Sequence, residues 1–371
     1  MTMRIVLFLL VIAINTCGMN EKQLKDFVES YEIVKEIFLP NDTDSFVSIL
    51  HDSHGNRLIA GTMDGIGVWG CEGYKLTYFD SSSTNNKDIV YDQENDLLYY
   101  IGGDNRKVWS KDMQQGKDGK HTDLLSLDRY GCSLAYNVAQ KQLSLGLFNG
   151  LTVVTPGKLE SKITRPLYAS ASYQGEVRTL DFGNINGTEI IYLGLSNGEV
   201  QMRTDSNNFY KSKSLGNFVS LLRVDQYRNH VWVNGMKRGV ITQCDMDLEN
   251  AKNIQYAGAL TSTQAFEHDC ISNLLCIASH SDIVPVGANF NMLHIVFPQI
   301  TDDFGTPIIQ MNICLKSLPR AVACDYARNT FYVALLDRIC VVKPKTPLLM
   351  ALNTQAFFIY SHFLPQPRSV N

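Results

Sequence analysis

Seven times along the chain, a short apolar run ends in a polar turn and a second run rich in β-forming residues follows at once. The runs are Phe46–Gly61, Asp88–Gly103, Cys132–Gly150, Val177–Gly198, Val219–Gly239, Phe266–Ile283 and Ala321–Val342. Six of them have a polar turn residue, at Asp52, Asp92, Asn137, Asp225, Asp269 and Asp325, and the fourth turns through 183–187. The spacing gives a unit of about 44 residues, which is the length of a propeller blade. A unit this short must stack on copies of itself to bury its sheet faces.

Each repeat has the pattern of four short strands. In the first unit they are residues 47–50, 58–60, 66–69 and 74–79, with Asp64-Gly65 as the hairpin turn between the second and third. Regular β-rich runs with turn residues between them predict an all-β fold. We therefore expect a seven-bladed β-propeller of four-stranded antiparallel blades, because closing the ring removes exposed edges.

The segments before and within the repeats add three expectations. Residues 20–29 have helical periodicity and predict a short helix, and Tyr31–Leu39 can supply the outer strand of the seventh blade. The sixth repeat is the longest, and we interpret 284–314 as an insertion with an extra strand at Met292–Phe297. Trp69 and Trp109, which are 40 residues apart, are expected to fill space between neighbouring sheets.

The first 18 residues have the features of a secretory signal. Arg4 is followed by ten apolar residues at 5–14 and by the small residues around Gly18. Ten residues are too few to cross a bilayer, which needs about 20. We expect cleavage after Gly18, with an uncleaved anchor as the alternative. The domain prediction is a signal at 1–18, a helix and closing strand at 19–45, repeats at 46–346 and a packed tail at 347–371.

Cysteines and sequons support a secreted, extracellular glycoprotein. Loss of Cys17 with the signal leaves eight cysteines, an even number typical of disulfide pairing. Cys270 and Cys276 flank a short turn and are the clearest candidate pair; the other pairings stay open, and several of these cysteines can equally be buried thiols. Asn41 and Asn186 begin glycosylation sequons in expected loops.

Charge argues against a nucleic-acid partner, and hydropathy argues against a transmembrane segment after the signal. The formal net charge of −4 argues against nucleic acid, whose partners are strongly basic. No second apolar segment has the length and purity of a transmembrane helix, because the apolar residues at 347–363 are interrupted by polar ones. We expect no transmembrane segment once the signal is removed.

Two repeats resemble known propeller families. Pro319–Val333 and Asp88–Tyr100 are similar to YWTD-type or NHL-type repeats, in which an apolar strand, an Asp-containing turn and an aromatic strand follow in order. The first unit resembles propeller repeats of bacterial sensor ectodomains. The YWTD tetrad itself is replaced by Tyr99-Tyr-Ile-Gly102 and Tyr332-Val-Ala-Leu335. The resemblance covers most of the mature chain and implies architecture.

The sequence shows no catalytic constellation. Glu267 and His268 form the only adjacent titratable pair in an inner strand, and we interpret them as channel wall. His51 and His54 are three apart in a turn, a spacing that does not place them on one face. Zinc spacings and nucleophile or phosphate-loop motifs are missing. We therefore expect no catalytic residue, no metal and no cofactor.

Binding is the better hypothesis, since propeller loops between second and third strands gather on one face. The candidate residues there are polar or charged: Asp64, Asp104, Arg106, Asn149, Asn197, Lys237, Arg238, Asp282, Asp337 and Arg338. We expect a secreted, non-enzymatic protein that binds an extracellular protein or a small polar ligand through this face. The alternatives are a calcium-dependent lactonase or esterase, whose metal needs several oxygen ligands, and a small-ligand sequestering protein similar to Yellow and royal-jelly propellers.

Overall fold

The computed structural model describes residues 21–345, with gaps at 41–43, 104, 128–129, 149, 155–175, 205–208, 216–217, 236–237, 259–260, 282–289 and 304. The predicted signal sequence, the Asn41 sequon and the predicted packed tail at 347–371 lie outside the described residues. Among the described residues, no helix is long and apolar enough to cross a membrane.

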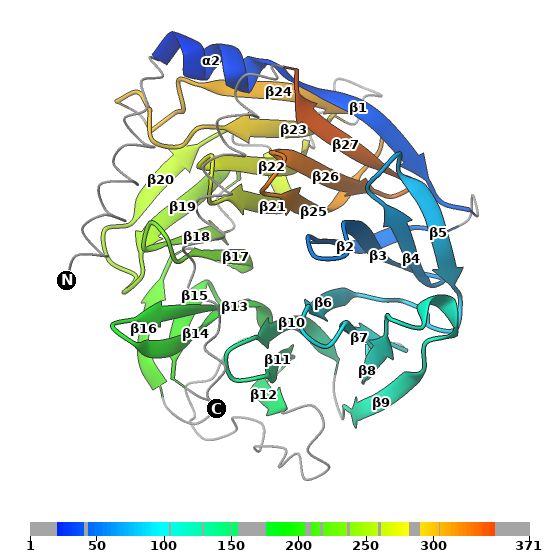
Figure 1. Ribbon diagram of the computed structural model, residues 1–371. Helices are drawn as coiled ribbons and strands as arrows, with labels where there is room; N and C mark the ends of the chain where they lie inside the picture. Colours follow the sequence, from blue (N-terminus) through cyan, green and yellow to red (C-terminus); the bar gives the residue numbers. More distant parts are fainter. Residues whose placement is uncertain are drawn as a thin grey trace, which may run out of the picture.

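The described strands form seven antiparallel sheets arranged as a closed ring, which confirms the seven-bladed propeller (Figure 1). Blades 1 and 2 are β2 (Phe46–Asp52), β3 (Arg57–Thr62), β4 (Ile66–Gly70), β5 (Lys75–Asp80), and β6 (Asp88–Asp92), β7 (Leu97–Gly102), β8 (Lys107–Asp112), β9 (His121–Ser126), with a 3-10 turn at Gly116–Asp118. Blade 3 has three described strands, β10 (Gly131–Asn137), β11 (Gln142–Leu147) and β12 (Gly150–Val154).

The remaining blades each have four strands, and in every blade the first strand is innermost (Figure 1). Blades 4 and 5 are β13 (Val177–Ile185), β14 (Thr188–Leu195), β15 (Glu199–Arg203), β16 (Phe209–Ser214), and β17 (Val219–Asp225), β18 (His230–Gly235), β19 (Val240–Asp245), β20 (Lys252–Gln255). Blade 6 is β21 (Thr261–Asp269), β22 (Leu274–Ser281), β23 (Phe290–Val296) and β24 (Gln310–Leu315). Blade 7 is β25 (Pro319–Asp325), β26 (Thr330–Leu335), β27 (Arg338–Pro344) and β1 (Tyr31–Phe38).

Strand β1 closes the ring, as the sequence predicted. It pairs with β27 from Tyr31↔Pro344 to Phe38↔Arg338 and so supplies the outer strand of the last blade. Helix α2 (Glu21–Glu29) precedes it and lies against the outer edge of blade 6 (Figure 1). The apolar side of α2 is buried: the rings of Phe27 and Tyr31 are 5.4 Å apart.

The hydrophobic core lies between neighbouring sheets. Trp69, which is 1% exposed, packs against Phe46 of its own blade and Tyr332 of blade 7. This is the inter-sheet position predicted for the first tryptophan, while Trp109 is only half-buried against the cluster between blades 1 and 2. Burying these apolar surfaces provides the main stabilisation of the ring.

Two expectations for the sixth repeat were wrong. The run at Met292–Phe297 is most of β23, the regular third strand, so it is not an extra strand within an insertion. Cys270 and Cys276 form no disulfide: the register pairs Cys276 with Glu267 on β21, whereas Cys270 already lies in the turn. All eight cysteines among the described residues are free thiols.

The turn residues also hold neighbouring blades together on one side of the ring, which we call the turn face. Each turn carboxylate caps backbone N–H groups of its own turn, as Asp92 does for Glu94 at 3.1 Å. In three of these turns the second oxygen also reaches the residue that precedes the turn residue in the next blade. Tyr136 donates to Asp92 at 2.7 Å, His268 lies 3.5 Å from Asp225, and His51 lies 3.6 Å from Asp325 across the closure.

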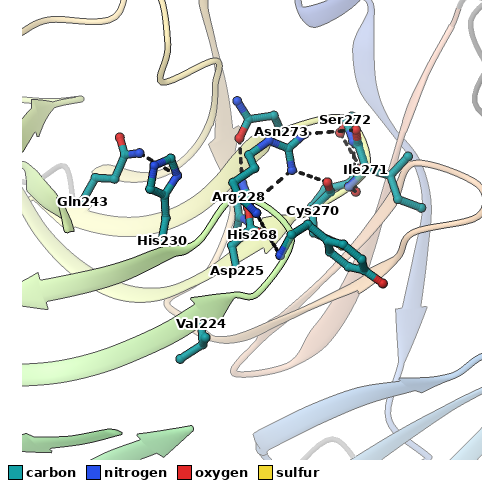
Figure 2. A network of polar contacts seen from close by, with 12 residues as sticks. Val224, Asp225, Arg228, His230, Gln243, His268, Cys270, Ile271, Ser272 and Asn273 are labelled. Atoms are coloured by element: carbon teal, nitrogen blue, oxygen red, sulfur yellow. Dashed lines mark hydrogen bonds and ion pairs between the residues drawn. The ribbon is translucent and has the colours of Figure 1, made fainter. Parts of the chain in front are cut away.

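The joint between blades 5 and 6 shows this arrangement most fully (Figure 2). Asp225 accepts from Tyr227 N at 3.0 Å and from Arg228, which in turn donates to the carbonyl of Cys270. His268 is buried, lies 3.0 Å from Asn273 Oδ1 and packs against the Trp232 ring at 5.1 Å. Burial lowers the pKa of His268 to about 4, so the ring is neutral at pH 7.

The neutral His268 makes this joint sensitive to acid. In the unfolded chain His268 has its ordinary pKa of 6.5, so between pH 6.5 and 4 the unfolded chain binds more protons than the folded chain. The free energy of unfolding therefore decreases as the pH falls through this range. We expect His268→Gln to be destabilised at pH 7.5, and the difference from wild type to shrink by about 2 kcal/mol at pH 5. Urea unfolding of both proteins at the two pH values measures this. A difference that does not change with pH would contradict it.

Candidate functional site

The loops between second and third strands lie on the side opposite the turn face, which we call the loop face. Of the ten predicted binding residues, the structure describes six there: Asp64, Arg106, Asn197, Arg238, Asp337 and Arg338. The other four, Asp104, Asn149, Lys237 and Asp282, lie outside the described residues. The six belong to blades 1, 2, 4, 5 and 7, so they surround the ring and do not form one cluster.

Several of these residues stabilise the scaffold. Arg338 donates to Asp337 at 3.0 Å and to Glu36 of β1 at 3.3 Å, so it joins the closing strand to the last blade. The hydrogen bond from Arg338 lowers the pKa of Asp337. Asn197 caps its own turn by accepting from Glu199 N at 3.1 Å. Arg106 instead lies over the exposed ring of Tyr130, 4.9 Å from its centre.

The inner strands of all seven blades surround a cavity of about 740 Å³ on the ring axis. This volume is within the range of small-ligand sites. Its wall combines apolar inner-strand residues, which the sequence suggested, with charged ones that include Asp88, Asp181, Arg223 and Glu267. The cavity is therefore a channel lined by both apolar and charged side chains.

One arginine organises the charges in the middle of the channel. Arg223 and Glu267 form an ion pair at 3.0 Å between blades 5 and 6. Burial alone would lower the pKa of Arg223, but Glu267 and Asp181 raise it above its ordinary value. Glu267 and His268 therefore both line the channel as expected, and His268 also belongs to the buried joint between the blades.

Two of the aspartates in the channel wall hold inner strands together. Asp88 accepts from Leu134 N of blade 3 at 2.7 Å, and Asp181 accepts from Val224 N of blade 5 at 2.9 Å. Desolvation raises the pKa of Asp88 to about 6 and also raises that of Asp181. Inner strands of neighbouring blades belong to different sheets and do not pair through their backbones. The two carboxylates therefore accept hydrogen bonds from backbone N–H groups that would otherwise lack a partner.

A second polar cluster lies between the outer parts of blades 1 and 2. Lys111 is fully buried and donates to Asp80 at 2.6 Å and to Gly119 O at 3.2 Å. His121 Nε2 is 2.7 Å from Asp80 and 2.9 Å from Ser82 Oγ. A catalytic triad needs the acid and the nucleophile on opposite ring nitrogens, and here both contact Nε2. The cluster is a buried ion pair that joins two blades.

Metal ligation finds no support in the part of the chain that is described. It contains no group of three or more His, Cys, Asp or Glu side chains placed to hold a metal ion. The acids of the channel wall are engaged by backbone N–H groups and by Arg223, so they are not free oxygen ligands for calcium.

The buried ion pair gives a stability prediction. Lys111→Met leaves Asp80 without its cation in a buried site, so we expect a loss of about 3 kcal/mol in the free energy of unfolding. Adding Asp80→Asn should restore part of this loss, because no charge is then left unpaired. Lys107→Met removes an exposed ion pair with Asp123 and should cost less than about 1 kcal/mol. Equal effects of Lys111→Met and Lys107→Met in urea unfolding would contradict this assignment.

Comparisons with known proteins identify the fold of the chain but not its family. No protein-family model matches the chain, and no curated protein matches it either. Among solved structures, the β-propeller domain of Cps50 (Swd1) from Myceliophteria thermophila has a TM-score of 0.64 at 14% identity, over 84% of this chain and 99% of that one. Kluyveromyces lactis Hsv2 has a TM-score of 0.57 at 11% identity, over 79% and 90%. The resemblance to YWTD-type and NHL-type repeats has no family match.

Proposed function

We propose that this propeller is a binding module that recognises a protein partner through its loop face. The observation that carries the proposal is a set of arginine–aromatic pairs on that face. Arg106 lies over Tyr130, and Arg338 lies over Phe38 at 4.8 Å from the ring centre. Arginine and tyrosine are enriched at protein interfaces, where they often contribute much of the binding energy.

Exposed apolar side chains accompany these pairs. Tyr130 and Phe148 are 49% and 51% exposed and adjoin each other, since Phe148 N donates to Tyr130 O at 3.2 Å. Met63 and Phe38 are also exposed at the loop face. Apolar rings beside charged groups on a rigid scaffold provide the anchors that a protein partner needs. We assign Tyr130, Phe148 and Arg106 as the centre of the contact and refer to them as the anchor residues.

The turn face is the alternative surface, and it carries the exposed residues Val138, Tyr227 and Tyr326. Asn186, the sequon asparagine between β13 and β14, is exposed on this face. A glycan on Asn186 would shield the turn face and leave the loop face open. The turn face therefore offers the matched control for any test of the anchor residues.

A pull-down with three proteins tests the proposal. We expect wild type to recover specific partners from the source organism, and Arg106→Glu with Phe148→Ala to lose them by tenfold or more in quantitative mass spectrometry. Val138→Ala with Tyr227→Ala, on the turn face, should keep the same partners. Both variants must show the circular dichroism and melting temperature of the wild type. Loss of partners by the turn-face variant alone would contradict the proposed binding surface.

Secretion is a separate part of the proposed function and is supported by the N-terminal sequence and by the exposure of Asn186. The eight free thiols weigh against it, because secreted proteins usually pair their cysteines. Expression of the full chain in a eukaryotic secretory host tests it. We expect mass spectrometry to find a chain beginning at Met19 with glycans on Asn41 and Asn186. An intact N-terminus with neither site modified would contradict secretion.

A further inference from the structure

A β-bulge recurs at the start of the inner strands. In six of the seven described inner strands, a register shift leaves one residue without a partner on the second strand: Val47, Cys132, Arg178, Ser220, Gln264 and Arg320. In blade 2, Lys87 occupies the same position, because Asp88 pairs with Ile101 as Ser48 pairs with Gly61. Bulges re-aim side chains and are common beside binding sites. We call these seven residues the bulge positions.

Three bulge positions are basic, and all three line the axial cavity: Lys87, Arg178 and Arg320. They belong to blades 2, 4 and 7, so they are spread around the mouth of the channel rather than placed side by side. The mouth is on the loop face, since the second-to-third-strand loops contact the residues just before the inner strands, as in the bond from Gly131 N to Asn105 O. Three cations therefore surround one opening.

The contacts of these cations leave donors available. Lys87 Nζ donates to the carbonyl of Gly131 at 3.3 Å, and Arg178 pairs with Glu176 at 2.7 Å and lies over the Phe218 ring. Arg320 forms no ion pair with the described residues. Like charges around one opening repel each other unless an anion lies among them, and an arginine fork suits phosphate or carboxylate oxygens. Among the described residues, Glu176 and Asp88, which directly follows Lys87, offset part of this charge at the mouth.

The charge changes sign deeper in the channel. Asp181 and Glu267 lie about two residues deeper along their inner strands, where Arg223 is the cation that interacts with both. An anion drawn to the mouth would thus be held there and repelled from the interior. The cavity has the volume of a small-ligand site.

We propose that the mouth of the channel is a binding site for a small polyanion bearing phosphate or carboxylate groups, held by Lys87, Arg178 and Arg320. The site goes beyond the protein-binding surface of the anchor residues and does not depend on it. The bound anion would complete the charge balance of the mouth, and its affinity should fall with rising salt because the contacts are partly exposed ion pairs.

Calorimetry on the purified chain tests the site, with sodium tripolyphosphate and citrate as the two probes. We expect one of them to bind wild type and to bind Lys87→Met with Arg320→Met about 100-fold more weakly, which is about tenfold for each cation removed. The stronger probe identifies the group, phosphate or carboxylate, that the site prefers. Lys75→Met with Lys252→Met removes the same charge from exposed outer strands and should bind as wild type does.

Three results would overturn the proposal. The first is that wild type binds neither probe. The second is that Lys75→Met with Lys252→Met weakens binding as much as Lys87→Met with Arg320→Met does. The third is that Lys87→Met with Arg320→Met binds the probe as tightly as wild type does. The melting temperature of each variant without a probe shows whether it is folded, and Lys87→Arg keeps the charge if Lys87→Met is unstable. Because no partner protein takes part, this experiment can fail or succeed independently of the pull-down.

Discussion

Pairing of β1 with β27 is the interaction on which the other features of this molecule depend. It joins residues some 300 positions apart in the chain and turns a row of seven sheets into a ring. Tyr31 at its start is buried against Phe27 and Phe331, and Glu36 near its end binds Arg338. Without closure, blades 1 and 7 would each expose an apolar face, and the axial channel would have no wall on that side.

Once the ring is closed, its regular positions have structural roles. The turn residues cap their own turns and, with the residues that precede them, join neighbouring blades on the turn face. The apolar residues of the strands fill the space between sheets. Chemistry that varies from blade to blade is left to the loops and to the bulge positions. This division explains why the candidate binding residues gather on the loop face.

The sequence predicted the fold well because strand pattern and turn chemistry are local. The seven repeats, the helix that ends at Glu29 and the closing strand that begins at Tyr31 could be recognised from short stretches of sequence. The roles of His51 and His268 could not, because each meets an aspartate of the preceding blade, and for His51 that blade is the last in the chain. The spacing of His51 and His54 indicates only that they do not share one face, and nothing in the sequence around His51 indicates its partner.

The candidate site was predicted only in part for a similar reason. The loop residues could be named from the hairpin turns, but what Arg106 contacts depends on the next blade. Aligning the bulge positions requires the strand register, and without it Lys87 and Arg320 look like ordinary surface charges. The same lack of register led to the wrong Cys270–Cys276 pairing, because closeness along a turn does not place two thiols on opposed positions of a hairpin.

A ring built from regular positions thus presents an irregular set of cations at the mouth of its channel, and we propose that they hold an anion. A crystal structure with selenate, located by its anomalous signal, tests whether they do. We expect a selenium peak at the channel mouth, with selenate oxygens within about 3 Å of Lys87 and Arg320 donors. Selenate bound only at other surface residues, with the mouth free of it, would show that these cations do not form an anion site.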